Sequence, residues 1–118
     1  MTNATPGPED AIAALGDPTR RAIVEQLRHG ALPVGELARG LTVSRPAVSQ
    51  HLKILSDAGL LEVTPRGTRR VYALAPQGVA NLRRYLDRLW DDALAAFVAE
   101  AERRAEPAKT PPPKPEIS

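Results

Sequence analysis

Polar side chains with a capacity for base recognition are concentrated between Ser44 and Lys53. Val48, Leu52 and Leu55 recur at intervals of four and three residues, which predicts one buried helical face. The polar residues of the segment then fall on the exposed faces or at the cap, and the DNA-contact candidates among them are Ser44, Arg45, Pro46, Ser49, Gln50, His51 and Lys53. Arginine can pair with both acceptors of a guanine edge and glutamine with an adenine edge, so this helix suits a DNA major groove.

A second group of cations follows directly. Two β-prone runs, residues 60–64 and 69–74, are joined by Pro65-Arg66-Gly67-Thr68, in which proline and glycine favour a turn. This predicts a hairpin with a basic tip. Its arginines suit phosphates or a narrow minor groove, and the contact candidates are Arg66, Thr68, Arg69 and Arg70.

Charge is distributed unevenly along the chain. The net charge is only +2, yet residues 44–70 carry five basic side chains (Arg45, Lys53, Arg66, Arg69, Arg70) against two acidic ones (Asp57, Glu62). Such a basic patch indicates a polyanionic partner, and a solvated charged face is the alternative interpretation.

Several chemistries are excluded by residue types. The chain has no cysteine, which removes disulfides, thiol catalysis and thiolate metal sites. With only two histidines, His29 and His51, a metal site would need carboxylates as well, so no cofactor is expected and nickel is the alternative. The sequence contains no catalytic nucleophile with a matching general base and no phosphate-binding loop, so we expect no enzyme activity. The acids Asp87, Asp91 and Asp92 fit a solvated helix face.

Shorter helices are expected before the polar segment. Proline and glycine punctuation predicts one from Pro8 to Gly16 with Ile12 and Leu15 on its apolar side. A second is capped by Asp17 and runs to Arg28 and His29, and a third spans residues 34–39.

A long amphipathic helix is expected from Pro76 to about Glu106. Its apolar stripe exceeds what so small a core needs, which predicts a homodimer. The interface candidates are Ile12, Leu15, Leu82, Leu86, Leu89, Trp90, Ala93 and Phe97. Residues 9–106 are predicted to form one domain between disordered segments 1–8 and 107–118. No apolar run or signal sequence is present, so we expect a cytoplasmic protein without membrane contact.

Four stretches of the chain resemble the ArsR-type family of winged-helix regulators over about residues 10–105: Ala14-Leu-Gly-Asp-Pro-Thr-Arg-Arg-Ala-Ile-Val24, Val34-Gly-Glu-Leu-Ala38, Val43-Ser-Arg-Pro-Ala-Val-Ser-Gln-His-Leu-Lys-Ile-Leu55 and Gly67-Thr-Arg-Arg-Val-Tyr72. The resemblance implies a mainly α winged helix-turn-helix with a β-hairpin wing and a homodimer through the first and last helices. The Ser44 helix would be the recognition helix. Metal sensors of the family carry Cys-Val-Cys where this chain has Pro33, Val34 and Gly35, so thiolate metal sensing is not implied.

These observations predict a transcription regulator, most simply a repressor, that binds a pseudo-palindromic site in double-stranded DNA as a homodimer. Two alternatives stay open. One is a regulator that responds to a small molecule or nickel at the dimer seam, and the other is a winged-helix module that binds a protein partner.

Overall fold

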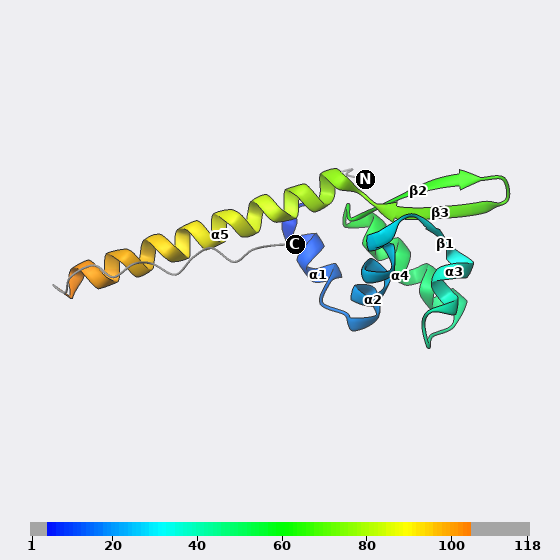
Figure 1. Ribbon diagram of the computed structural model, residues 1–118, viewed down its shortest axis with the longest axis horizontal. Helices are drawn as coiled ribbons and strands as arrows, with labels where there is room; N and C mark the ends of the chain where they lie inside the picture. Colours follow the sequence, from blue (N-terminus) through cyan, green and yellow to red (C-terminus); the bar gives the residue numbers. More distant parts are fainter. Residues whose placement is uncertain (1–4, 105–118) are drawn as a thin grey trace. The chain divides into compact units, whose positions relative to one another are not determined.

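The computed structural model describes residues 5–104. The elements in chain order are α1 (Pro8–Ala14), α2 (Pro18–Gln26), the 3-10 turn η1 (Leu27–His29), β1 (Leu32–Pro33), α3 (Val34–Arg39), α4 (Arg45–Asp57), β2 (Leu61–Arg66), β3 (Arg69–Leu74) and α5 (Pro76–Arg103) (Figure 1). They form two compact units, one up to Leu82 and one from Arg83 onward. The predicted mainly helical fold with a β-hairpin is confirmed.

Two helices begin where capping chemistry predicts. The Asp17 carboxylate accepts a hydrogen bond from the Arg20 N–H at 3.0 Å, and Pro18 occupies the first position of α2. The Ser44 hydroxyl accepts from the Ala47 N–H at 3.3 Å in the same way at α4. Each cap satisfies one of the backbone donors that a helix leaves free in its first turn.

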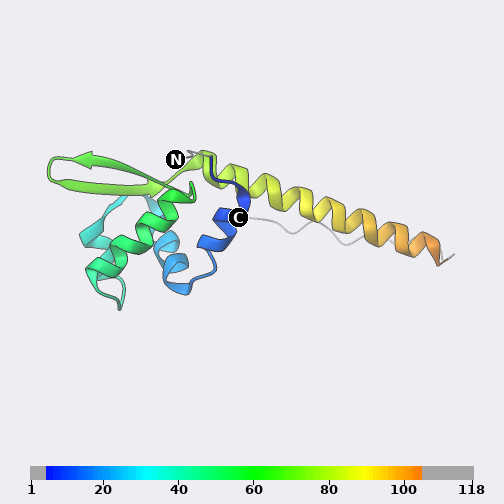
Figure 2. The same ribbon diagram turned by 180° about the vertical axis from the view of Figure 1, so that it is seen from behind.

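Helix α4 is the centre of the first unit. It contacts α1, α2, α3 and β2, and it lies beside the hairpin in both views (Figures 1 and 2). The predicted stripe of Val48, Leu52 and Leu55 is fully buried together with Ile23 and Leu37. The buried stripe fixes the rotation of α4, and its opposite face is therefore presented outward.

The sheet corrects the predicted hairpin in two respects. Short strand β1 adds to it, giving the antiparallel order β1-β3-β2. The hairpin pairs Arg66 with Arg69, so the turn consists of Gly67 and Thr68 alone, with Gly67 at φ 63°. Pro65 was expected in the turn but pairs with Arg70 inside β2. An edge strand tolerates proline because its outer side needs no backbone donor.

Helix α1 buries small residues in place of the larger ones. Ala11 and Ala14 are buried, whereas Ile12 is 44% exposed and Leu15 is half-buried against the core. Of the two residues expected to mark the apolar side of α1, Leu15 therefore packs against the core and Ile12 does not.

Helix α5 buries no residue completely. In the first unit, Leu82 packs against the core, and a Cβ at Gly78 would lie 1.7 Å from the Gly59 carbonyl oxygen, so only glycine fits there. In the second unit, Leu86, Leu89 and Phe97 are 41%, 54% and 49% exposed. The helix ends at Arg103, before the expected Glu106.

The remaining expectations concern the ends of the chain and membranes. The predicted disordered segments lie outside the described residues, except for residues 5–8, where Thr5 to Gly7 lead into α1. Among residues 5–104, no helix is long and apolar enough to cross a membrane.

Candidate nucleic-acid interface

The polar face of α4 is open to solvent. Six of its seven sequence candidates are exposed: Ser44, Arg45, Pro46, Ser49, Gln50 and Lys53. The seventh, His51, is half-buried and has a different environment. Burial of the Val48, Leu52 and Leu55 stripe against the core produces this arrangement.

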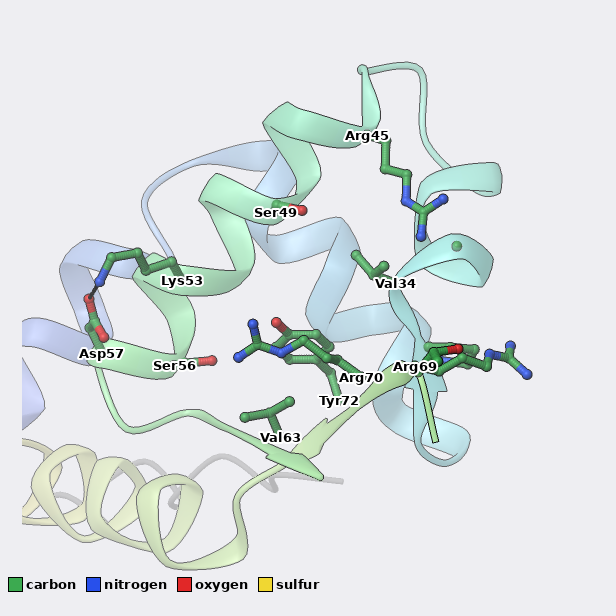
Figure 3. A pocket seen from close by; sticks show the side chains of 13 residues that line it. Val34, Arg45, Ser49, Lys53, Ser56, Asp57, Val63, Arg69, Arg70 and Tyr72 are labelled. Atoms are coloured by element: carbon green, nitrogen blue, oxygen red, sulfur yellow. Dashed lines mark hydrogen bonds and ion pairs between the residues drawn. The ribbon is translucent and has the colours of Figure 1, made fainter. Parts of the chain in front are cut away.

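A groove of about 630 Å³ separates α4 from the hairpin, which we call the wing (Figure 3). We refer to this space as the helix–wing groove. Its lining comes from β1, α3, α4 and the wing with its turn: Pro33, Val34, Gly35, Arg45, Ser49, Lys53, Ser56, Asp57, Val63, Thr68, Arg69, Arg70 and Tyr72. The groove therefore unites six of the eleven predicted contact residues, from α4 and from the wing. The other five lie outside its lining: Ser44, Pro46, Gln50, His51 and Arg66.

The helix–wing groove is strongly cationic. Arg45, Lys53, Arg69 and Arg70 line it, with Asp57 as the only acid in its lining. The Lys53 ammonium lies 2.9 Å from the Asp57 carboxylate, so part of its charge is neutralised. The net excess of positive charge suits a polyanion.

Neighbouring wing arginines take opposite directions. Figure 3 shows Arg70 pointing toward α4 and Arg69 pointing away from it, as alternation along a strand requires. At the other end of the groove, the Arg45 guanidinium lies above α3, where a Cβ on Gly35 would be 4.0 Å from Nη2.

His51 faces the start of α2. Its Nδ1 lies 3.5 Å from Arg20 Nη1 and 4.0 Å from an Asp17 carboxylate oxygen. The guanidinium of Arg20 can only donate, and the role of His51 Nδ1 depends on the tautomer of the ring. These contacts favour a helix-packing role for His51 over direct contact with DNA.

The same cluster perturbs Asp17. The Arg20 N–H donates to its carboxylate, and this hydrogen bond holds the pKa of Asp17 below its usual value of 3.8. The charges of Arg20 and His51 add to the effect, and partial desolvation opposes it.

Sequence reasoning missed the role of Arg20 and Arg21. Arg20 Nε donates to the Ala14 carbonyl at 2.6 Å, and Arg21 Nη1 donates to the Leu15 carbonyl at 2.8 Å. Both carbonyls lie at the end of α1, where a helix lacks internal donors. The two arginines thus fasten α1 to α2, and Arg20 also contacts α4 through His51.

The floor of the groove was also missed. Val34, Val63 and Tyr72 supply its apolar lining, and Ser56 contributes a hydroxyl oxygen that is buried without a hydrogen-bond partner among the described residues. Val63 pairs with Tyr72 across the wing. Strand pairing was the one sequence signal that could have placed these two side chains together.

No group of three or more histidine, aspartate or glutamate residues within 5–104 is arranged to hold a metal ion. Pro33 and Gly35, where metal sensors of the resembling family carry cysteine, line the helix–wing groove. Neither side chain offers a metal ligand.

Comparison with known proteins agrees with this geometry. A helix-turn-helix domain family matches residues 15–64. The HTH-type transcriptional regulator Rv2034 of Mycobacterium tuberculosis is 62% identical over 90 residues, which cover 76% of this chain and 84% of that protein. An ArsR-like transcriptional regulator from Rhodococcus sp. RHA1 has a similar structure, with a TM-score of 0.67 and 33% identity over 80% of this chain and 92% of that one.

A third similar structure is the homodimeric winged helix-turn-helix DNA-binding domain Mb0332 from Mycobacterium bovis, with a TM-score of 0.58 and 28% identity over 73% of this chain and 80% of that one. The order of elements, the groove between helix and wing, and these relatives agree. The chain belongs to the ArsR-type family of winged helix-turn-helix transcription regulators.

Proposed function

We propose that the protein binds double-stranded DNA at specific sequences, with α4 in the major groove and the wing beside the sugar–phosphate backbone. The observation that carries this proposal is the helix–wing groove, which brings cations from α4 and from β3 to one surface. An α-helix fits the width of the major groove, and phosphates supply the charge that this surface lacks.

We propose further that the active form is a homodimer. Leu86, Leu89 and Phe97 are exposed on α5 and fall within one helical stripe, which a soluble helix normally covers. The similar Mycobacterium bovis domain is described as homodimeric. Two recognition helices related by two-fold symmetry call for a pseudo-palindromic site with half-sites about one helical turn apart.

A dimer on such a site within a promoter would exclude RNA polymerase, so repression is the regulatory role that we propose. The protein would act in the cytoplasm, where bacterial DNA is found.

Binding to duplexes enriched from a random library tests specificity. Fluorescence anisotropy should give an enriched duplex at least a hundredfold advantage over a scrambled one, within the usual range for specific binding. Affinity should fall steeply between about 50 and 200 mM salt because counterions are released. Equal affinity for all duplexes at physiological salt would contradict the proposal and favour a protein-binding module.

Metal ions provide a separate test. Because Pro33 and Gly35 offer no ligands, zinc, cadmium and arsenite should leave operator affinity within about threefold. Nickel is the most stringent test among these ions, because it binds imidazole and carboxylate ligands, which this chain contains. A tenfold response to any of these ions would contradict the prediction.

A further inference from the structure

We propose that the helix–wing groove holds one DNA strand by its phosphates, with Arg45, Ser49 and Arg70 as the phosphate contacts, and that Gln50 reads the bases. This inference rests on the proposed DNA-binding function and divides its residues between two tasks. It differs from what residue types alone predict, because they place Arg45 with Gln50 as a base reader.

The rotation of α4 separates the two tasks. Arg45, Ser49 and Ser56 follow one another at steps of four and seven residues, so they form one line along the helix. All three line the groove. Gln50 is exposed but does not line it, because a step of five residues from Arg45 turns its side chain about 140° away.

The wing supplies the facing wall. Arg70 points from β3 toward α4 (Figure 3). Tyr72 lies two residues further along β3, so it shares this face of the strand and also lines the groove. Arg70 and Arg45 thus enter the groove from opposite walls. A guanidinium can donate two parallel hydrogen bonds to a phosphate, and the Ser49 hydroxyl can donate another.

The shape of the groove suits a strand better than a base edge. Its volume of about 630 Å³ is larger than a single phosphate group needs. Bases of a duplex point away from its backbone, so a strand held in the groove by its phosphates with the bases turned outward would present their edges to the outer face of α4. Gln50 lies there, and its amide can pair with adenine.

Paired charge distinguishes Lys53 from the proposed contacts. Its ammonium is held by Asp57 at 2.9 Å, so contact with a phosphate would require sharing or breaking that pair. Within residues 5–104, no acidic side chain lies within ion-pair distance of Arg45 or Arg70, so these two arginines can donate to a phosphate without breaking an ion pair.

Salt-dependent affinities of the full chain test the division. On an operator enriched from random duplexes, Arg45→Gln and Arg70→Gln should weaken operator and scrambled DNA by equal factors and lower the salt slope by about 0.9 for each lost phosphate contact. Gln50→Ala should weaken the operator alone, by about 5- to 150-fold, with an unchanged slope. Arg28→Gln, at an exposed arginine that pairs with Glu25, is the matched control and should change neither.

Neutral phosphates locate the contact directly. A set of operators would each carry one uncharged methylphosphonate at a different position. At one position we expect the modification to weaken binding by the wild-type protein but to cause no further loss of affinity in Arg45→Gln, which already lacks this contact. If no such position exists, or if Arg45→Gln weakens only the operator, the division is wrong. Wild-type protein without preference for any duplex would instead contradict the proposed function itself.

Discussion

A small cluster formed by Asp17, Arg20 and His51 joins three helices. Asp17 caps α2 through the Arg20 N–H, and it lies beside His51 of α4, while Arg20 reaches the last turn of α1. The cluster therefore fixes the bundle from which α4 presents its polar face. Disturbing it should change the stability of the fold before it changes any contact with DNA.

Substitution of Asp17 separates cap from charge. Asp17→Ala should lower the melting temperature by removing the cap, whereas Asp17→Asn keeps a capping oxygen and should lower it less. Because the folded-state pKa of Asp17 is below 3.8, its ionic contribution is present above that pH and disappears as the pH falls through the folded value. Urea titrations from pH 7 to pH 3 should therefore show the wild-type and Asp17→Asn proteins converging in acid. A constant gap would show that the charge contributes nothing.

Ser56 offers a contrast among hydroxyl groups on one helix. Its oxygen is buried without a partner in the described part of the chain, so removing it should leave stability unchanged or raise it by up to about 1 kcal/mol. Ser44→Ala should instead lose about 1 kcal/mol with the α4 cap, and Ser49→Ala at an exposed site should change little. Chemical denaturation of the three variants would give this order, and a clear loss in Ser56→Ala would reveal a partner for its hydroxyl.

Residue patterns predicted much of the site, because exposed and buried positions of a helix follow from its period. The outward residues of α4 and the basic wing were placed correctly on the surface. The contacts of His51 with α2 could not be predicted in this way, because they involve Asp17 and Arg20, which lie 34 and 31 positions earlier in the chain. The carbonyl contacts of Arg20 and Arg21 were likewise invisible, because they depend on the angle between α1 and α2.

At the scale of elements, the wing depends on its two-residue turn. Gly67 has φ 63°, a conformation that costs residues with a Cβ about 1 kcal/mol or more. Gly67→Ala should therefore loosen the wing, while Gly67→Asn, which tolerates positive φ, should preserve it. Hydrogen exchange of the β2 and β3 amides should be faster in the alanine variant alone. Equal protection in both variants would contradict this account.

Element boundaries were predicted where they depend on neighbouring residues and were missed where they depend on pairing with a distant segment. Caps at Asp17 and Ser44 located two helix starts because they act within one turn. Strand β1 was not predicted, since two residues carry no period and Leu32 and Pro33 become a strand only by pairing with Tyr72 and Val71. The hairpin was placed correctly, but its turn was shifted because pairing with Arg70 draws Pro65 into β2.

At the scale of the whole molecule, α5 carries more apolar surface than the protomer covers. Leu89 is 54% exposed, and it lies on the same apolar stripe as Leu86, Ala93 and Phe97, which are also exposed. In an isolated protomer a carboxylate at this position would stay hydrated and cost little. In a dimer that closes over the stripe, the same carboxylate would be buried without a partner.

Leu89→Asp tests this directly, with Ala95→Asp as the control because Ala95 is also exposed but lies on the opposite side of α5. Both variants should keep their helical circular dichroism, since neither site is buried in the protomer. Light scattering should show that only Leu89→Asp is monomeric. Its operator affinity should fall on the order of a hundredfold, because a single recognition helix loses the advantage of two linked half-sites. A dimeric Leu89→Asp protein with normal operator affinity would place the stripe outside the interface, whatever surface the two protomers then share.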